Sequence, residues 1–383
     1  MSIPQQFRPA HLPLVPAEPP ARGELVEGRD AVLTLLESLL GAHSPVPAQA
    51  AAGDPVTASP AWVRRAAAAA APAAVWAVLV RDGAAWGLAV LADRVDDAGA
   101  RSGLLSGGGG YRSGMLTTPG LRASGDVART ALSLAGPLGT ALAAGADARG
   151  SALELAGLPD TPAVRALAAA AGADLAAGLP VPVVERPAEG THLVSAGMRK
   201  NLRKTANRLA TDGVGVQVRL SRDPDAFAAA LPEIEAAYRD RDAAHALACP
   251  LDTPAGRRTW LDRLAALGEA GRRELATLHL DGELAAYVVG VPEGGRYGVF
   301  EGRFVTRWAR YSPGRLLEHT VLQHAFADPA VQVVDWMTGV APETLLTVSR
   351  FEPRVVVHRP AAAAALLGPA VTVVDRAQRV SAR

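Results

Sequence analysis

The stretch Ser312-Pro313-Gly314-Arg315-Leu316-Leu317 decides how this chain is interpreted. It follows a segment of strand character that ends near Phe304, and it opens a helical run over residues 315–326. The first turn of a helix carries backbone N–H groups without intrahelical acceptors, and the helix dipole adds partial positive charge there. A strand, a Pro-Gly turn and a helix start in this order therefore predict an anion-binding site, typically for a phosphate.

The composition is that of a globular protein. Hydrophobic residues make up 49% of the 383 positions and charged residues 20%, which excludes a disordered chain. The net charge of +1 argues against a broad surface for nucleic acid or for a membrane. The single cysteine, Cys249, excludes an internal disulfide and a multi-cysteine metal site, and it fits a reducing cytoplasm. We expect no metal.

The sequence shows neither a targeting signal nor a membrane span. Residues 1–20 are proline-rich and lack the basic-then-apolar pattern of a signal peptide. The longest apolar stretch, residues 66–80, contains Pro72 and is shorter than the roughly 20 residues that a membrane span needs. We expect a cytoplasmic protein that binds neither membrane nor nucleic acid.

Two similar hairpins lie in the two halves of the chain. The first has strands over 75–80 and 86–91 around Asp82-Gly83, and the second has strands over 275–280 and 283–291 around Asp281-Gly282. Each is followed by a glycine-rich loop, an extended segment, a long helix and another strand. This repeated order predicts two copies of one α/β unit.

A basic helix is predicted between the copies, over residues 195–209. Its apolar residues fall on one face: Met198, Leu202, Ala206 and Leu209. Like charges are spaced i,i+4 elsewhere on it, in the pairs Arg199 with Arg203 and Lys200 with Lys204. Such pairs weaken a helix slightly, so an anionic partner is expected to offset them.

These features together resemble the GNAT-type acyltransferases of the cellulose-biosynthesis (CelD-like) group, which are related to the Fem-type aminoacyltransferases. The resemblance rests on the Arg-Lys-Asn-Leu-Arg-Lys helix, the Asp281-Gly282 hairpin, the Ser-Pro-Gly helix start and the strand that ends in Asp335. It is good over residues 195–347 and loose over 74–187.

The resemblance implies an α/β (α+β) protein of two tandem GNAT-like folds, each a central mixed sheet flanked by helices. We expect an N-terminal extension and linker over 1–60 and a degenerate GNAT-like domain over 61–190. A C-terminal GNAT domain with the acyl-donor site is expected over 191–383. The corresponding turn of the first half, Arg122-Ala-Ser-Gly-Asp126, puts a carboxylate at the anion position and therefore favours the second half as the donor site.

By the same resemblance the chain is an N-acyltransferase that moves an acyl group from acetyl-CoA or a longer acyl-CoA to an amine by direct attack. The acceptor is a small-molecule or peptide amine. The residues expected to contact the donor are Phe300, Ser312, Gly314, Arg315 and Leu316, with the amides of the last three on the pyrophosphate. The common GNAT turn, Arg/Gln-x-x-Gly-x-Gly/Ala, is not strictly matched, and the family's lysine after Gly339 is absent.

Two carboxylates are candidates for the general base. Glu301 lies on the strand over 299–303, and Asp335 closes the strand over 331–335, where open α/β sheets commonly carry chemistry. The alternative for Glu301 is an ion pair with Arg303 or Arg296 on a solvent face. The alternative for Asp335 is a cap for the following turn.

Strand alternation adds a second expectation, which concerns the faces of this strand. It places Glu301 and Arg303 on one face and Phe300 and Gly302 on the other. The residues predicted to line the acceptor site are Tyr238, Arg241 and Tyr311.

Other functions stay open. In one, an acyl carrier protein supplies the acyl group on phosphopantetheine, and the basic helix docks this acidic carrier. In another, the donor is an aminoacyl-tRNA, by Fem-type analogy, which the net charge of +1 disfavours. In a third, the chain is a recognition module that kept the fold and lost the chemistry, which the missing lysine favours.

Overall fold

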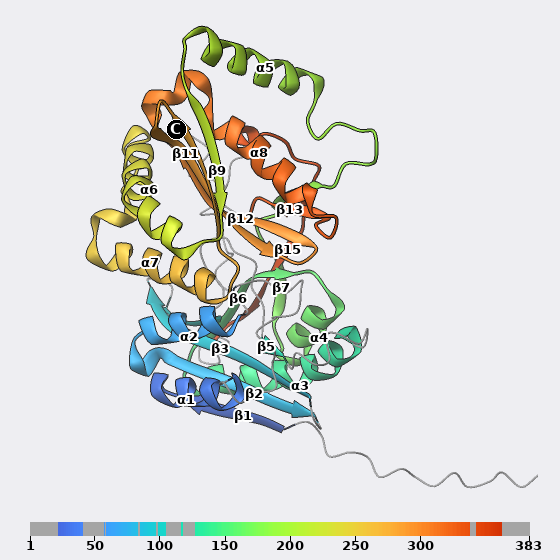
Figure 1. Ribbon diagram of the computed structural model, residues 1–383. Coiled ribbons are helices and arrows are strands. Elements are labelled where there is room, and N and C mark those ends of the chain that lie inside the picture. The colour runs from blue at the N-terminus through green and yellow to red at the C-terminus, as the bar shows by residue number, and fades with distance from the viewer. Residues whose placement is uncertain are drawn as a thin grey trace, which may run out of the picture.

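Two α/β units make up the computed structural model, each built on one mixed β-sheet with helices on both faces (Figure 1). The structure describes residues 22–40, 57, 59–82, 85–96, 99–104, 116–117, 127–337 and 342–361. The glycine-rich loop at 107–110, the turn at 122–126, Gly339 and most of the predicted linker at 42–60 lie outside the described residues. No helix in the described part of the chain combines the length and hydropathy that a membrane crossing needs.

The first unit has a sheet of order β1-β2-β3-β4-β6-β15-β7, with β5 paired to β3. Its strands are Arg22–Glu27 (β1), Val75–Asp82 (β2), Ala85–Asp96 (β3), Gly99–Leu104 (β4), Leu116–Thr117 (β5), Ala152–Pro159 (β6), Asp174–Ala177 (β7) and Arg354–Arg359 (β15). One face is covered by α1 (Arg29–Leu40) and α2 (Pro60–Ala69). The other is covered by α3 (Val127–Ala148) and α4 (Pro162–Ala170).

The second unit has a sheet of order β14-β8-β13-β12-β11-β10-β9. Its strands are Val181–Glu185 (β8), Val216–Ser221 (β9), Glu274–Leu280 (β10), Glu283–Glu293 (β11), Arg296–Phe304 (β12), Val333–Asp335 (β13) and Arg350–Glu352 (β14). Helices α6 (Pro224–Ala244) and α7 (Pro254–Glu269) cover one face. Helices α5 (Ala196–Thr211) and α8 (Pro313–Ala327) pack on the other.

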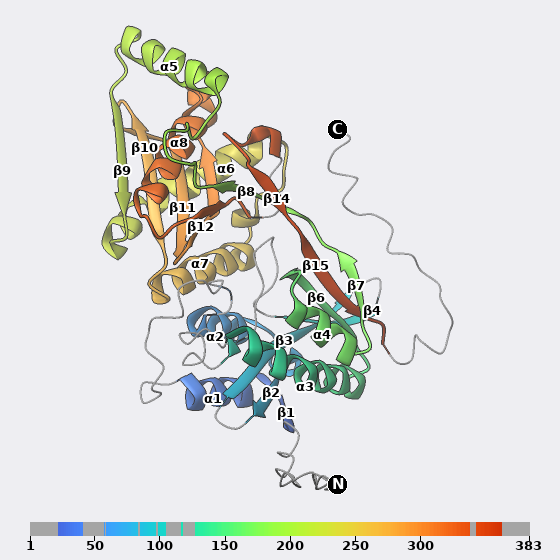
Figure 2. The ribbon, with the colours of Figure 1, turned by 90° about the vertical axis from the view of Figure 1, so that its right-hand side faces the viewer.

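The two sheets are copies of each other, but each takes one strand from the other half of the chain. The order β1-β2-β3-β4-β6-β15-β7 corresponds to β9-β10-β11-β12-β13-β8-β14. In both sheets the fourth and fifth strands pair parallel, and the other neighbours along this order pair antiparallel. The predicted two copies of one α/β unit are confirmed, with the sixth strand of each sheet exchanged. Figure 2 shows β15, in red, running from the second unit to lie beside β6 and β7 of the first.

This exchange bears on the predicted domain limits at residues 60 and 190. Residues 22–40, predicted as part of an extension, form β1 and α1, and β1 pairs along its whole length with β2. β8 lies before residue 190 but pairs in the second sheet, and β15 lies after it but pairs in the first. The limits stay a prediction, and both sheets draw strands from either side of residue 190.

The two predicted hairpins are β2–β3 and β10–β11, in equivalent positions of the two sheets. The turn of the second one has positive φ at both central residues, 52° at Asp281 and 81° at Gly282. Such a turn matches the twist of a two-residue hairpin, which explains the Asp-Gly sequence. The Asp281 carboxylate also accepts a hydrogen bond from the Gly215 N–H at 2.7 Å, which ties the hairpin to the start of β9.

A buried ion network lies where the exchanged strands meet. Arg296 of β12 donates to Asp335 of β13 at 3.1 Å and to Glu352 of β14 at 2.7 Å. Arg354 of β15 lies 3.2 Å from Glu352 and 3.8 Å from Asp335. Burial raises the pKa of Glu352, but Arg296 and Arg354 outweigh burial and lower the pKa to about 2. The network therefore joins four strands, one of which belongs to the other sheet.

The exchange predicts that a change late in the chain unfolds the first unit. Val357 of β15 is fully buried, whereas Phe351 of β14 is 49% exposed. Val357→Asp buries an unpaired charge between β6 and β7 and should destabilise the protein by more than ~3 kcal/mol. Hydrogen exchange should then show lost protection first in β6 and β7, with β10 to β12 less affected. Phe351→Asp is the control, and unchanged protection of β6 and β7 in Val357→Asp contradicts the exchange.

Candidate functional site

β12 carries a β-bulge at Phe300. Val289 of β11 pairs with Glu301 and the next residue, Gly290, pairs with Val299, so Phe300 has no residue opposite it. The bulge turns the side chains of both Phe300 and Glu301 toward α6 and α7. The prediction that strand alternation separates these two side chains is therefore wrong, because the extra residue breaks the alternation.

β12 also separates from its neighbour β13, at a point close to the bulge. The two strands pair only over residues 296–298 and 333–335, with Gly298 opposite Asp335 in the last pair. Beyond Gly298, β12 continues along β11 alone as far as Phe304. Its edge toward β13 therefore presents backbone N–H and C=O groups that the described part of the sheet does not use.

Helix α8 begins beside the end of β12. Ser312 is left-handed, with φ 47° and ψ 52°, and Pro313 is the first helical residue. The N–H groups of Gly314 and Arg315 lie in the first turn and have no intrahelical acceptor. The N–H of Leu316 donates to the Ser312 carbonyl at 3.2 Å, so two of the three predicted amides are available to an anion.

Gly314 lies against the last residue of β12. A Cβ atom at this position would lie 3.3 Å from the Phe304 ring. The close approach brings the open helix end next to the free edge of the strand. A phosphate bound at α8 and an extended chain bound along β12 would therefore be continuous.

The Glu301 carboxylate is partly buried and accepts two hydrogen bonds. The indole N–H of Trp260 donates to Oε2 at 2.9 Å, and the Tyr287 hydroxyl donates to Oε1 at 2.7 Å. Burial raises the pKa of Glu301, and the charge of Arg303 and the two hydrogen bonds offset this only in part. The structure does not show the alternative, an ion pair with Arg296 on a solvent face, because Arg296 belongs to the network of Asp335. A carboxylate with a raised pKa suits proton transfer near neutral pH.

One predicted acceptor residue, Tyr238, lies beside Glu301, and a second, Arg241, lies at the end of β12. The Tyr238 ring packs edge-on against Trp260 at 5.9 Å and lies under the guanidinium of Arg303 at 4.5 Å. Arg241 stacks on Phe304 at 4.4 Å, and burial and the charge of Arg303 lower the pKa of Arg241. These contacts form a polar cluster on the α6 face of β12.

The third predicted acceptor residue lies elsewhere. Tyr311 is fully buried in the core on the α8 face of the sheet, and its hydroxyl donates to Asp212 at 2.7 Å. Asp335 is likewise separate from Glu301, because its carboxylate is held by Arg296. Asp335 also accepts from the Met337 N–H at 2.8 Å, which is the turn cap given as its alternative role.

Sequence reasoning missed the partners that define the Glu301 environment. The sequence favours core packing for Trp260 over a place in a pocket, and Tyr287 lies in an apolar run of β11 that carries no catalytic pattern. It also missed Glu318, which lies one turn after Gly314 on α8. Glu318 accepts from the Leu346 N–H at 3.0 Å, and burial raises its pKa to about 7. A carboxylate within an otherwise apolar helical stripe was its only sequence signal.

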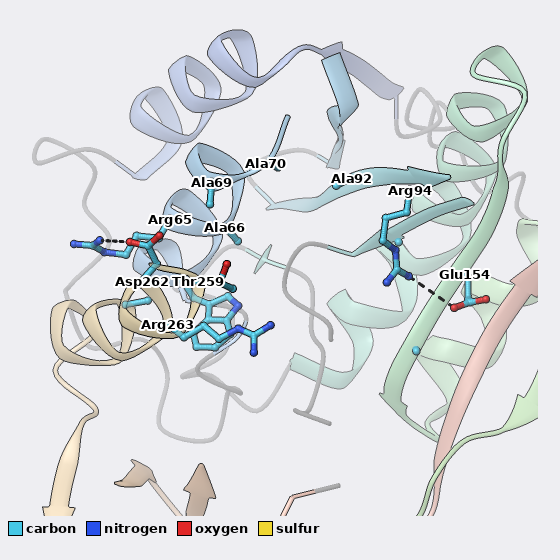
Figure 3. Close-up of a pocket in the computed structure, with 14 residues that line it drawn as sticks. Arg65, Ala66, Ala69, Ala70, Ala92, Arg94, Glu154, Thr259, Asp262 and Arg263 are labelled. Atoms are coloured by element: carbon cyan, nitrogen blue, oxygen red, sulfur yellow. Dashed lines mark hydrogen bonds and ion pairs between the residues drawn. The ribbon is translucent and has the colours of Figure 1, made fainter. Parts of the chain in front are cut away.

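A separate cavity of about 450 Å³ lies between the two units (Figure 3). Helices α2 and α7 form one side of it, and β3, β4 and β6 the other. Its charged residues pair within each of its sides, Arg65 with Asp262 at 3.5 Å and Arg94 with Glu154 at 3.9 Å. Trp62 lines the cavity and also packs on Phe300, with ring centres 6.0 Å apart. The cavity thus adjoins the bulge without including any residue of the predicted site.

Neither a metal centre nor a thiol nucleophile is apparent in the described residues. Within them, no group of three or more His, Cys, Asp or Glu side chains is arranged to hold a metal ion. Burial raises the pKa of the Cys249 thiol, which keeps it protonated at neutral pH.

Comparisons with known proteins agree with this geometry. Residues 196–343 match the model of the acetyltransferase (GNAT) domain. No curated protein matches the chain. The matched segment contains α5, the bulged strand β12, the start of α8 and β13, and the first unit repeats its strand order. The expected fold, two GNAT-like α/β units in tandem, is confirmed.

Several solved structures share this fold at low sequence identity. FemX matches with a TM-score of 0.51 and 10% identity over 76% of this chain and 85% of its own. A conserved protein of unknown function from Bacteroides thetaiotaomicron gives 0.53 and 11%, over 87% and 99%. The C-terminal domain of a putative lysylphosphatidylglycerol synthetase from Agrobacterium fabrum gives 0.50 and 13%, over 82% and 90%.

The hydrogen bonds to Glu301 predict the direction of a pKa change. The Tyr287 hydroxyl lowers the pKa of Glu301, so Tyr287→Phe should move the titration of this carboxyl to higher pH. Carboxyl carbon NMR shifts followed against pH measure it directly. Tyr297→Phe is the matched control, since that buried hydroxyl donates to Glu274 instead, at 2.8 Å. A Glu301 titration that stays in place or moves to lower pH in Tyr287→Phe contradicts the assigned contact.

Proposed function

We propose that the chain is an N-acyltransferase that moves an acyl group from acyl-CoA to an amine by direct attack. The observation that carries the proposal is the arrangement on β12. There a bulge and a free strand edge lie beside the partly buried Glu301 carboxylate, and the strand ends at the open first turn of α8. The match of residues 196–343 to the acetyltransferase (GNAT) domain supports the same reaction class. Within this class we assign the chain to the CelD-like group, on its basic helix and its Ser-Pro-Gly helix start.

The donor would bind across two elements. The amides of Gly314 and Arg315 and the dipole of α8 would hold the pyrophosphate, and the exposed Ser312 lies at the same turn. The pantetheine would extend along the edge of β12 that β13 leaves free, where backbone groups can pair with its amides. The residues present fit this donor, because Gly314 adds no side chain where the strand and the helix approach each other.

The reaction then needs polarisation of the thioester and removal of a proton. A backbone N–H at the Phe300 bulge would donate to the thioester carbonyl, which takes up negative charge as the amine attacks. Glu301, ionised, would accept the proton of the amine directly or through water. A C–N bond forms, the C–S bond breaks, and the thiolate leaves and is protonated. Because Cys249 stays a thiol, no acyl-enzyme intermediate is part of the proposal.

The acceptor is a small-molecule or peptide amine that enters next to Tyr238 and Arg241. Tyr238 packs on Arg303 beside Glu301, and Arg241 stacks on Phe304 at the end of β12, so an amine that enters next to Tyr238 would lie near the carboxylate. The low net charge and the single cysteine support a cytoplasmic setting without nucleic acid.

Replacement of the proposed base tests the proposal most directly. Glu301→Gln keeps one acceptor oxygen for the two donors Trp260 and Tyr287 but cannot take a proton, so turnover should fall by about 10²–10⁴-fold. The affinity for acetyl-CoA, measured by calorimetry, should stay nearly unchanged, because the pyrophosphate contacts lie on α8. Glu318→Gln is the control, since it removes the other carboxylate with a raised pKa and should retain turnover. A loss below about threefold in Glu301→Gln would exclude it as the base.

Gly314 tests the donor site independently. A β-branched side chain there would press on Phe304 and cover the two free amides, so Gly314→Val should weaken acetyl-CoA binding by more than ~10-fold. Gly136→Val on α3 is the control, because a Cβ at Gly136 meets nothing within 4 Å and the change lies in the first unit. Calorimetry with both variants decides the point, and unchanged affinity in Gly314→Val would place the donor elsewhere.

A further inference from the structure

Helix α5 concentrates positive charge that the acyl-transfer proposal does not use. Its sixteen residues contain no carboxylate and five basic side chains: Arg199, Lys200, Arg203, Lys204 and Arg208. The last four are exposed. Among the described residues no ion-pair partner contacts Lys200, Arg203 or Lys204. The charges therefore face solvent and repel one another at i,i+4 spacing.

The placement of these charges is locally unfavourable for the helix. Arg199 lies in the first turn and Lys200 directly after it, near the helix end where the dipole favours acidic side chains, and α5 has none in its first turn. Each such conflict costs a few tenths of a kcal/mol at an exposed site. α5 therefore carries several unfavourable charge placements that no other residue of the helix offsets. Such uncompensated placements are expected where a segment serves a function.

The choice of lysine at two of these positions is a second observation. The chain contains two lysines, Lys200 and Lys204, and both lie on α5, while every other basic side chain apart from histidine is an arginine. Lysine presents a compact, mobile ammonium group suited to a single anionic group, whereas arginine favours fixed bidentate contacts. Two lysines one turn apart suit separate, movable carboxylates better than one rigid phosphate.

The orientation of α5 shows from which side a partner would arrive. Leu209 is buried, and Met198 and Leu202 pack against the core on the α8 face. At 100° per residue, Lys200 and Lys204 lie on the opposite side of the helix. Figures 1 and 2 show α5 at the end of the second unit that is remote from the first. A ligand lying within the sheet would meet the inner face, so the lysines suit a partner that docks from solvent.

α5 also flanks the proposed donor site. Arg208 donates to the backbone carbonyl of Arg310 at 2.8 Å, just before the Ser-Pro-Gly turn. At the other end of the helix, the Arg315 guanidinium lies 4.0 Å from the Met198 sulfur. A partner seated on α5 would therefore stand next to the amides of Gly314 and Arg315.

We propose that α5 is the docking surface for an acidic acyl carrier protein, which presents its acyl group on phosphopantetheine to the site on β12. The inference rests on the proposed function and names its donor. The phosphate of the arm would take the place of the CoA pyrophosphate at Gly314. The chemistry is unchanged: the amine nitrogen bonds to the acyl carbon, the C–S bond breaks, and the carrier's thiol is released.

An acidic protein fits this surface better than a nucleic acid. The basic positions span residues 199–208, about 14 Å of one helix at 1.5 Å per residue. The chain as a whole has a net charge of +1 and a pI of about 8.0, without the broad basic footprint typical of nucleic-acid binding. A short stripe of point charges matches the acidic face of a single helix.

The test compares two donors on one charge-reversed variant. Lys200→Glu/Lys204→Glu is assayed with acetyl-CoA and with an acyl carrier protein that carries acetyl-phosphopantetheine. With the carrier, kcat/KM of the variant should fall by about 10–100-fold. The dependence of kcat/KM on salt concentration should also be weaker in the variant than in the unchanged protein. With acetyl-CoA, kcat/KM should stay within about twofold of the unchanged protein. Arg219→Glu/Arg258→Glu reverses two exposed charges on β9 and α7 and serves as the matched control.

Each other outcome has a distinct meaning. Equal losses with both donors would assign α5 to the CoA nucleotide and overturn carrier docking. If the enzyme turns over acetyl-CoA but not the acylated carrier, carrier docking is overturned while the proposed function stands. The same holds if turnover of the carrier is unchanged in the α5 variant. Inhibition by tRNA that disappears in the lysine variant would assign the surface to RNA and overturn it as well. Failure to bind or use either donor would instead refute the proposed function.

Discussion

The reciprocal exchange of β8 and β15 is the constraint on which the rest of the structure depends. Neither sheet is complete without a strand from the other half, so the two units are joined through hydrogen-bonded ladders as well as through a packed surface. Where the strands meet, Asp335, Glu352 and Arg354 are buried, and each charge is balanced by another from a different strand. Removing one partner would leave an unpaired charge in the interior, which costs more stability than losing an ion pair on the surface. The same network fixes the site, because Asp335 faces Gly298 in the last pair before β12 and β13 separate.

Function in this arrangement follows from one departure from regular strand geometry. A regular β12 would place Phe300 and Glu301 on opposite faces, but the bulge turns both toward α6 and α7. Glu301 then accepts hydrogen bonds from Trp260 and Tyr287, which fix its position, while burial raises its pKa. The cavity between the units, by contrast, is lined by charged residues that pair within each of its sides. Glu301, whose pKa burial raises, lies on β12 and does not line that cavity.

The comparisons support the fold, whereas the proposed chemistry is argued from the residues of the site. FemX shares the arrangement at 10% identity, so strand order and layer packing persist where side chains do not. Proteins of one fold carry out different reactions, because the reaction depends on a few residues at a few positions. In the proposed reaction those positions are the bulge, the Glu301 carboxylate and the first turn of α8. The basic surface of α5 lies beside them and has a separate explanation. Its like charges lower the stability of the helix, so we attribute them to the binding of a partner.

The sequence by itself determined the local elements, because their signals are local. The Asp281-Gly282 turn, the helix that starts at Pro313 and the apolar face of α5 follow from backbone conformations and periodicities that neighbouring residues set. It also indicated Glu301 and Tyr238, which the fold brings together. Only the tertiary structure decided the exchange of β8 and β15, the pairing of Asp335 with Arg296, and the burial of Tyr311. It alone shows the bulge at Phe300 and the roles of Trp260 and Tyr287, since these depend on which strand lies opposite and which helix lies above. Such neighbours lie far apart along the chain, as Arg359 of β15 and Leu153 of β6 do, and no local pattern encodes them.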